Sequence, residues 1–435
     1  MKTNKKGSST VFMTMIIVTF MMMILISINI SRRLVIKSQT ESFGRVWSKA
    51  ILSEYDIHLF EDYNLLAFKG NDQEISERLS RYFKYSFEGR MKSKLKDAKV
   101  SLSGYEMRDP KNFKRSIENS LKAETLDTII NGNSRVNREN NGSGEVSESD
   151  ESGRKIGNVL VLDTLPSRGV TSGPDVSNAI ETLKQKDVFD KLKDKGIGTA
   201  GELMFIYKNL DSHLKTAEKG QTYFTNEWEY IVHGKPDDMA NYTSCRRKIF
   251  MIRNGLNLAS LKGNPTKMSI ISAAAAAITP GPAALATEIL LMELWAAAES
   301  EYDVQTLVQG GKVPVMKTGE TWKTDLSIIL NGDKLKNSLD EDALKNLNKN
   351  KADIINMDGA KSGSEDGYGN GYEDYLLLLM FLMNENTRVL RTMDLVQINM
   401  KYRYYEDFNF AEYYTGLSFS LRINNYEYQI KDKYK

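Results

Sequence analysis

A single uncharged stretch near the N-terminus constrains this 435-residue chain more than any other feature. The segment from Thr10 to Ile30 contains no charged residue, and apolar side chains occur on every side of it when it is drawn as a helix. A helix of this length spans about 30 Å, which matches the hydrocarbon thickness of a bilayer. An ordinary amphipathic helix has only one apolar stripe. We therefore expect residues 10–30 to form a transmembrane helix.

A cleaved signal peptide is the alternative for this stretch. Signal peptides usually have a shorter apolar region of about 7–15 residues, which small residues follow at the cleavage site. Here the apolar run ends in Asn-Ile-Ser-Arg-Arg, which does not fit such a site. The sequence thus favours a retained anchor after a basic leader at residues 1–9. Three lysines precede the span and three basic residues follow it, so charge alone leaves the orientation open.

Charge and cysteine content narrow the function classes. Six of the 59 basic residues and none of the 57 acidic residues lie in residues 1–40, so the remainder carries a net charge of −4. A mildly acidic body argues against nucleic acid as a partner. The single cysteine, Cys245, excludes an intrachain disulfide and a cysteine metal cluster. It lies on an apolar helical stripe, so we expect a buried thiol and not a nucleophile.

The first helix is expected to continue beyond the membrane. Apolar residues recur near helical spacing from Ile36 to Ile51, and only Gly44 interrupts them. This stripe opens a juxtamembrane helical or α+β region at residues 31–130. Residues 131–158 are rich in Asn, Ser, Gly and Glu and poor in apolar side chains, so we expect a disordered linker or loop there.

The rest of the chain, residues 159–435, is expected to form the main domain. Alternating apolar residues on both sides of Asn424-Asn425 predict a terminal β-hairpin, because asparagine tolerates the left-handed conformation of a tight turn. The predicted class is α+β, with a transmembrane helix that extends into a mostly helical domain with short strands and a C-terminal β-hairpin. The other patterns predict helices at 72–95, 111–130, 176–194, 199–217, from 237 or 238 to about 259, and 372–400. They also predict strands at 99–105 and 227–234, a short strand and turn at 159–167, and a polar loop at 331–371.

An alanine-rich stretch at residues 270–300 allows two interpretations. Pro280-Gly281-Pro282 divides it into two halves. Glu288 and Glu293 would each cost about 2–3 kcal/mol in the middle of a membrane. We therefore expect a buried helical hairpin, with a second membrane segment as the alternative.

The sequence contains no recognisable catalytic or metal-binding motif. Its three histidines are far apart, and no His-Glu-x-x-His, Cys-x-x-Cys or Gly-x-Ser-x-Gly occurs. The Gly-rich segment 365–374 lacks the end of a phosphate loop and the oxygen spacing of an EF-hand, so we expect a loop that ends in a helix cap. We assign no catalytic residue, metal ligand or cofactor. The candidates considered are His58, His213, His233, Glu288, Glu293, Glu299 and Glu301.

The residues Lys5-Lys6-Gly7, small polar residues and a long apolar helix follow one another at the N-terminus. This order resembles the leader of type IV pilin-like proteins, especially the minor pseudopilins of tight-adherence (Tad) pilus systems. The resemblance implies that the leader stays in the cytoplasm and that a prepilin peptidase cuts between Gly7 and Ser8. That family usually has glutamate at the fifth mature position, which is Phe12 in this chain.

Several other segments resemble an uncharacterised domain family of Gram-positive bacteria. Members of that family carry a pilin-like N-terminal helix and occur with tight-adherence pilus assembly proteins. The segments are KAILSEYDIHLFEDYNLLAF, EYIVHG, the alanine-rich stretch, ELWAAAESEYDVQTLVQGGKVPVMKT, YEDYLLLLMFLM and RTMDLVQINM.

We therefore expect a non-enzymatic, single-pass protein of the cell membrane, with a cytoplasmic N-terminus and an extracellular domain. The resemblances imply a minor pseudopilin-like component of a Tad-type pilus or related secretion assembly. Its expected partners are membrane lipid, prepilin peptidase, a platform protein and other pseudopilins, and not nucleic acid. A membrane-anchored extracellular hydrolase and a ligand-binding scaffold are the alternatives.

Overall fold

The computed structural model describes residues 6–89, 93–131, 164–185, 201–217, 221–358 and 369–434. They belong to two units. Unit 1 comprises Met1–Ser120 and Asn409–Lys435, and unit 2 comprises Leu121–Phe408. The two ends of the chain therefore share a unit, whereas the sequence grouped the C-terminal hairpin with the rest of 159–435. Long helices, short strands and a terminal hairpin confirm the α+β class.

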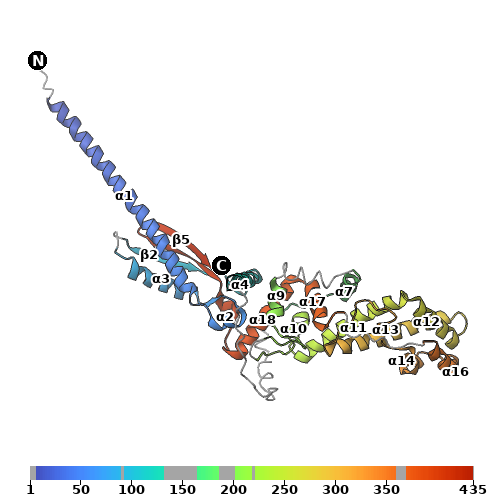
Figure 1. Ribbon diagram of the computed structural model, residues 1–435. Coiled ribbons are helices and arrows are strands. Elements are labelled where there is room, and N and C mark those ends of the chain that lie inside the picture. The colour runs from blue at the N-terminus through green and yellow to red at the C-terminus, as the bar shows by residue number, and fades with distance from the viewer. Residues whose placement is uncertain are drawn as a thin grey trace. The chain divides into compact units, whose positions relative to one another are not determined.

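The longest element of unit 1 is α1, one continuous helix from Lys6 to Leu52. Every side chain from Thr10 to Ile30 is exposed, whereas Ile36, Trp47 and Ile51 are buried. Among the described helices, only α1 is long and apolar enough to cross a membrane. The predicted continuation of this helix beyond the apolar segment is confirmed (Figure 1).

A three-stranded antiparallel sheet in the order β2–β4–β5 forms the centre of unit 1. Strand β2 spans Leu95–Ser101, β4 spans Gly416–Ile423 and β5 spans Tyr426–Lys433. The predicted hairpin is β4–β5, and Asn424 in its turn has a φ of 55°. Its alternation places apolar residues of β4 on one face of the sheet, where helices cover them.

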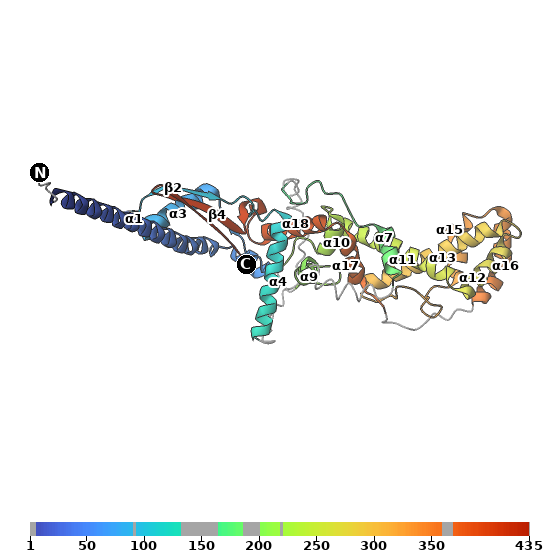
Figure 2. The same cartoon turned by 90° about the horizontal axis from the view of Figure 1, so that it is seen from above.

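The second half of α1 runs beside β5, and helix α3, Asp72–Ser86, adds a further apolar layer (Figures 1 and 2). Ser48 Oγ donates a hydrogen bond to Asp432 Oδ2 at 2.6 Å, which ties α1 to the last strand. Burial of apolar side chains from α1, α3 and the sheet supplies the main stabilisation. The core consists of Ile36, Trp47, Ile51, Leu52, Phe68, Ile75, Leu79, Phe83, Phe87, Leu102, Leu417, Phe419, Leu421, Ile423 and Ile430.

Shorter elements complete unit 1. Helix α3 ends at Ser86, nine residues before the predicted end at 95. Residue 95 is instead the first residue of β2. The strand predicted at 99–105 is β2, shifted toward the N-terminus. The remaining elements are α2 (Ile57–Tyr63), β1 (Phe68–Lys69), β3 (Tyr413–Tyr414), the 3₁₀ helix Phe410–Glu412, and α4 (Pro110–Asn131), whose second half belongs to unit 2.

In the described residues of unit 2 the regular elements are all helices, apart from an isolated bridge between Val313 and Asn370. The alanine-rich stretch forms the predicted helical hairpin, with Pro280–Pro282 between its two helices. One face of this hairpin is buried against the helices that follow it. The helices are α7 (Val176–Leu183), α9 (Gly201–Asn209), α10 (Glu227–His233), α11 (Asp238–Lys262), α12 (Pro265–Ile278), α13 (Ala284–Val308), α14 (Leu326–Asn331), α15 (Asp333–Lys336), α16 (Glu341–Asp358), α17 (Tyr372–Leu382) and α18 (Glu385–Arg403).

The prediction of a strand at 227–234 is wrong, because this segment is helix α10. The segment alternates large apolar residues with glutamates, which suggested one buried and one exposed face. In the structure Glu227 and Glu229 are as buried as Trp228 and Tyr230, so the alternation does not mark a solvent face.

Three other predictions for unit 2 need correction. The polar loop at 331–371 contains helices α15 and α16, and α16 buries the helically spaced Ala343, Leu347 and Ile354. The helix at 372–400 is two helices, because Asn384 caps a new one through hydrogen bonds from the backbone of Asn386 and Thr387. The helix at 199–217 ends at Asn209. The described end of 159–167 is a turn, as predicted.

Some predictions lie outside the described residues. They are the linker at 131–158 beyond Asn131, the first part of the strand at 159–167, the second half of the helix at 176–194, and residues 365–368 of the Gly-rich segment. The described end of that segment caps α17 as predicted, because Asp374 Oδ2 accepts a hydrogen bond from the backbone N–H of Gly371 at 2.9 Å.

Candidate functional site

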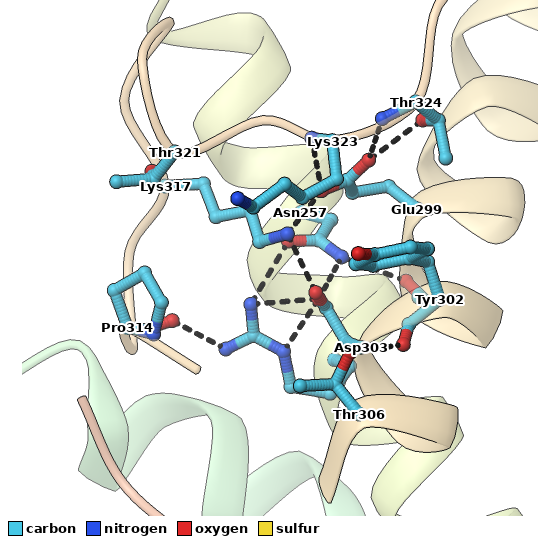
Figure 3. Close-up of polar contacts among 12 residues, drawn as sticks. Asn257, Glu299, Tyr302, Asp303, Thr306, Pro314, Lys317, Thr321, Lys323 and Thr324 are labelled. Atoms are coloured by element: carbon cyan, nitrogen blue, oxygen red, sulfur yellow. Dashed lines mark hydrogen bonds and ion pairs between the residues drawn. The ribbon is translucent and has the colours of Figure 1, made fainter. Parts of the chain in front are cut away.

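Helices α11 and α13 pack side by side and enclose four charged side chains (Figure 3). Successive charged or polar residues on each helix are four positions apart, so they project from one face. The loop after α13 contributes a lysine that contacts the acids of α13. We call this group the buried ion network. Its members are Arg253 and Asn257 of α11, Glu299 and Asp303 of α13, and Lys317 of the loop.

Arg253 and Asp303 form the centre of the buried ion network. Arg253 Nε donates to Asp303 Oδ2 at 2.9 Å, and Asn257 Nδ2 donates to the same oxygen at 2.8 Å. The guanidinium also donates to the carbonyls of Pro314 and Val315, each at 2.9 Å. Burial opposes the charge of Arg253, but Tyr375 and Asp303 outweigh it and raise the pKa of the guanidinium. Arg253 therefore stays charged and holds the loop on the two helices.

Glu299 anchors the other end of the loop. Its carboxylate accepts from the backbone N–H groups of Lys323 at 3.0 Å and Thr324 at 2.8 Å, and from the Thr324 hydroxyl at 2.6 Å. Lys317 Nζ lies between Glu299 and Asp303, 2.5 Å from Asp303 Oδ1. The network thus pairs two cations with two carboxylates, and a buried pair of this kind is retained only when each charge is compensated.

The hydrogen bonds and ion pairs of the buried ion network hold its own loop. Both carboxylates accept several hydrogen bonds or ion pairs from protein groups, so neither is poised to transfer a proton to another molecule. Its chemical role is to fix residues 314–324 against α11 and α13. The one signal for this network in the sequence is a charged residue, Arg253, beside the apolar Ile252 at a buried position of α11. It matches no known catalytic or metal-binding motif.

A second polar cluster surrounds the short buried helix α10. Glu227 Oε2 accepts from the backbone N–H of Asp211 at 2.7 Å, and Glu227 Oε1 accepts from Asn399 Nδ2 at 2.6 Å. Glu229 Oε1 accepts from the Tyr372 hydroxyl at 2.8 Å. Helix α10 is thus held through its acids by segments from both sides of it in the sequence.

Helix α18 supplies the other half of this cluster. Tyr230 donates its hydroxyl hydrogen to Asp394 Oδ2 at 2.9 Å, and Ser167 donates to the same carboxylate. Arg391 donates to the carbonyls of Ile231 at 2.8 Å and Val232 at 2.9 Å, and so satisfies the last turn of α10.

Burial shifts the acid–base properties of this cluster. It raises the pKa of Glu229 from its ordinary 4.5 to about 7 and that of Asp394 from 3.8 to about 6. Burial, with Lys248 and Lys235 nearby, lowers the pKa of His233 to about 4. All three groups therefore favour their neutral forms relative to the unfolded chain.

The predicted candidates do not come together in one site. Cys245 is buried as predicted, and burial raises the pKa of its thiol. His58 lies near the surface, 3.7 Å from Glu61. His213 packs its ring on Tyr242, with ring centres 4.3 Å apart. Within the described ranges, no three metal-ligating side chains form a group.

Of the four glutamates near the alanine-rich hairpin, only Glu299 joins a buried cluster. Glu301 pairs with Arg246 at the surface, Glu288 is half-buried and Glu293 is exposed. Gly7 and Ser8, the predicted cleavage site, lie in the first turn of α1, where the backbone alone is described.

Comparison with known proteins identifies a family and nothing finer. Neither the curated proteins nor the solved structures compared with the chain include a match. Residues 104–425 match a family of unknown function, DUF5702. This match covers α10, both polar clusters and the alanine-rich hairpin, and it amounts to most of the chain. The chain therefore belongs to the DUF5702 family of unknown function.

Proposed function

We propose that this protein is a single-pass membrane protein of the cell envelope that serves as a minor pseudopilin-like component of a Tad-type pilus or related secretion assembly. The observation that carries the proposal is the division of α1 into two parts. Its first part exposes an unbroken apolar surface from Thr10 to Ile30. Its second part, from Ile36 to Leu52, is an integral piece of the core of unit 1.

The first part of α1 fits lipid as its surroundings. The 16 apolar residues of this part, at about 0.3–0.6 kcal/mol for each large aliphatic or aromatic one, favour insertion over exposure to water. An assembly could withdraw such a helix from the bilayer by surrounding it with equivalent apolar helices. The partners that this implies are membrane lipid, a prepilin peptidase, a platform protein and other pseudopilins.

The second part of α1 supports the pseudopilin-like role. A helix that leaves the bilayer and continues unbroken onto an antiparallel sheet couples any pull on the helix directly to the folded unit. Ser48 and Asp432 form one such link between the helix and the sheet. The proposed orientation places the N-terminus in the cytoplasm and both units outside the cell.

The test is mass spectrometry of the N-terminus of the protein purified from its native membrane. We expect a chain that begins at Ser8 after cleavage behind Gly7. A Gly7→Leu variant should keep Met1. Val46→Leu, at an exposed position of the same helix, is the matched control and should be cleaved as wild type is. A native chain with an uncut leader would remove the processing step and with it the pseudopilin-like role.

Protease shaving of intact cells tests the orientation separately. We expect protease to remove epitopes placed in unit 2 while an epitope before Thr10 stays protected. The reverse pattern would place the units in the cytoplasm and contradict the proposal.

A further inference from the structure

Glu229 is a buried acid without a cation. Its side chain projects from α10 into the interior of unit 2. Oε1 accepts from the Tyr372 hydroxyl at 2.8 Å and from the backbone N–H of His213 at 3.2 Å, whereas the buried Oε2 receives no hydrogen bond. Within the described residues, no lysine, arginine or histidine forms an ion pair with it. A carboxylate in such a place is costly, and a neutral carboxylic acid is not.

The elements around α10 do not supply the missing positive charge. The nearby lysines and Arg391 donate to other groups: Lys235 to Ser244, Lys248 to the carbonyl of Pro174, and Arg391 to carbonyls of α10 and Ser172. The titratable groups that these elements present are Asp211, His213 and Lys215 of the preceding segment, Glu227 and His233 of α10, Asp238, Tyr242, Cys245 and Lys248 of α11, Tyr372 and Glu373 of α17, and Arg391 and Asp394 of α18.

Among the charged neighbours of Glu229, the Asp238 carboxylate favours the neutral form. The Asp238 carboxylate adds to the effect of burial in raising the pKa of Glu229, while the hydrogen bonds from Tyr372 and from the backbone of His213 lower it. Cys245 lies beside the same turn, with Sγ 3.9 Å from the carbonyl of Glu229, and its own thiol is held neutral by burial.

We propose that Glu229 is a proton-operated latch. It couples the packing of α10 against α17 to the pH of the medium that surrounds unit 2. With its proton, the carboxyl group stays buried beside Tyr372 and α10 is held in place. When the proton leaves to solvent, a carboxylate without a cation remains between the two helices, and this junction is the first part of unit 2 to loosen. The latch concerns unit 2 alone and does not depend on the membrane role of α1.

Infrared spectroscopy of the full-length protein in mild detergent tests the latch. The carbonyl stretch of a protonated carboxyl group should appear at pH 6 in the difference spectrum of wild type minus Glu229→Gln, and it should be lost by pH 8.5. The subtraction removes the band of Asp394, whose pKa is raised to about 6. Glu293→Gln, at an exposed position of α13, is the matched control, and its subtraction from wild type should leave no such band. Absence of the Glu229-dependent band at pH 6 would overturn the proposal.

A stability titration tests the coupling. Tryptophan fluorescence reports on unit 2, because Trp228, Trp295 and Trp322 all lie there. Between pH 5.5 and 8.5 the folding equilibrium constant of wild type should fall on the order of 10- to 100-fold relative to Glu229→Gln. An equal pH dependence in both proteins would refute the latch.

Tyr372→Phe provides an independent test of the proton on Glu229, which is needed if the Glu229→Gln variant folds poorly. The Tyr372 hydroxyl stabilises the ionised form of Glu229, so its removal should move the loss of the carboxyl band to higher pH. A band that moves to lower pH, or does not move, would contradict the assignment of the proton to Glu229.

Discussion

Gly44 of α1 lies so close to Ile430 of β5 that a β-carbon at Gly44 would collide with Cδ1 of Ile430. Glycine is usually unfavourable inside a helix by about 1 kcal/mol relative to alanine. Here it allows the helix backbone to approach the sheet and lets Ile430 fill the space above it. The one interruption of the apolar stripe is thus a point where α1 packs closely against the sheet.

Gly44→Leu should destabilise unit 1 by about 1–3 kcal/mol, because a large side chain overpacks this contact. Native-state hydrogen exchange of the backbone amides of β4 and β5, in the full-length protein in detergent, measures the change. The double variant Gly44→Leu/Ile430→Ala should be more stable than the sum of the two single changes implies, since the second change makes room for the first.

Val46→Leu is the matched control on the same helix, because Val46 is 59% exposed. Its effect should stay within about 0.5 kcal/mol. Equal costs at Gly44 and Val46 would show that the contact with Ile430 does not limit the packing of α1.

Lys317→Met should destabilise unit 2 by about 3–5 kcal/mol, because it leaves Glu299 and Asp303 with only one buried cation between them. Glu301→Gln breaks the half-exposed pair with Arg246 and should cost no more than about 1 kcal/mol. The comparison uses urea unfolding at neutral pH. If both variants cost the same, the burial of the ion network would not govern its strength.

Gly234→Ala should cost about 2–4 kcal/mol, from two effects that add. Gly234 ends α10 with a φ of 65°, and a β-carbon there would meet the guanidinium of Arg391. Gly281→Ala is the control, because Gly281 has a φ of 87° and no heavy atom near the added carbon. It should cost about 1 kcal/mol from backbone strain alone. Thermal unfolding of unit 2 separates the two values.

Local patterns predicted the elements whose signals lie within a few residues. The β4–β5 hairpin follows from alternation on both sides of Asn424, and α11 follows from its apolar stripe and the Asp237 cap, whose side chain accepts from the backbone N–H of Ala240 at 2.6 Å. The pairing of β4 with β2 was not predictable in this way. These strands are more than 300 residues apart, and no local rule selects the partner of an edge strand.

The main errors in the predicted secondary structure occur in helices whose buried residues do not follow a simple apolar pattern in the sequence. Helix α10 carries two glutamates that are fully buried because Tyr372, Asn399 and backbone N–H groups satisfy them. A reading based on polarity assigns such residues to the surface. In helix α16 the error is the opposite one. Its many lysines and asparagines make the segment polar overall, so its narrow apolar stripe was not recognised.

The polar clusters were not predictable as sites for a related reason. Arg253, Asp303 and Lys317 come from two helices and a loop, and only the fold brings them together. Their one local signal is a charge at a core-facing position of a helix. The apolar half of α1, by contrast, is fully visible in the sequence, because its length and composition alone make it long and apolar enough to cross a membrane.

Ile17→Lys should weaken membrane association, because a charge at the middle of the apolar segment costs about 2.5–3.5 kcal/mol on insertion. The measurement is the fraction of full-length protein that stays with the membrane after alkaline extraction. Val46→Lys, in the second half of the same helix, should behave as wild type. Equal extraction of all three proteins would show that residues 10–30 do not hold the chain in the bilayer.

The pH dependence of Asp394 can be separated from that of Glu229. Burial raises the pKa of Asp394 from 3.8 to about 6, while hydrogen bonds from Ser167 and Tyr230 work in the opposite direction. Between about pH 4 and pH 6, Asp394 therefore keeps its proton in the folded chain and releases it in the unfolded chain. The corresponding stability is fully present below about pH 4 and is lost as the pH rises through 6.

In a Glu229→Gln background, Asp394 should thus contribute about 2–3 kcal/mol less to the stability of unit 2 at pH 7 than at pH 4. His233 works in the opposite direction, because its lowered pKa adds stability as the pH rises. Asp394→Asn in the same background should remove the Asp394 contribution alone, since an amide does not titrate, so the difference between the two variants isolates it. Urea unfolding followed by tryptophan fluorescence at several pH values measures this difference. If the difference stays constant between pH 4 and pH 7, the proton resides on another group, and the carboxylate of Asp394 is already ionised beside Arg391 at pH 4.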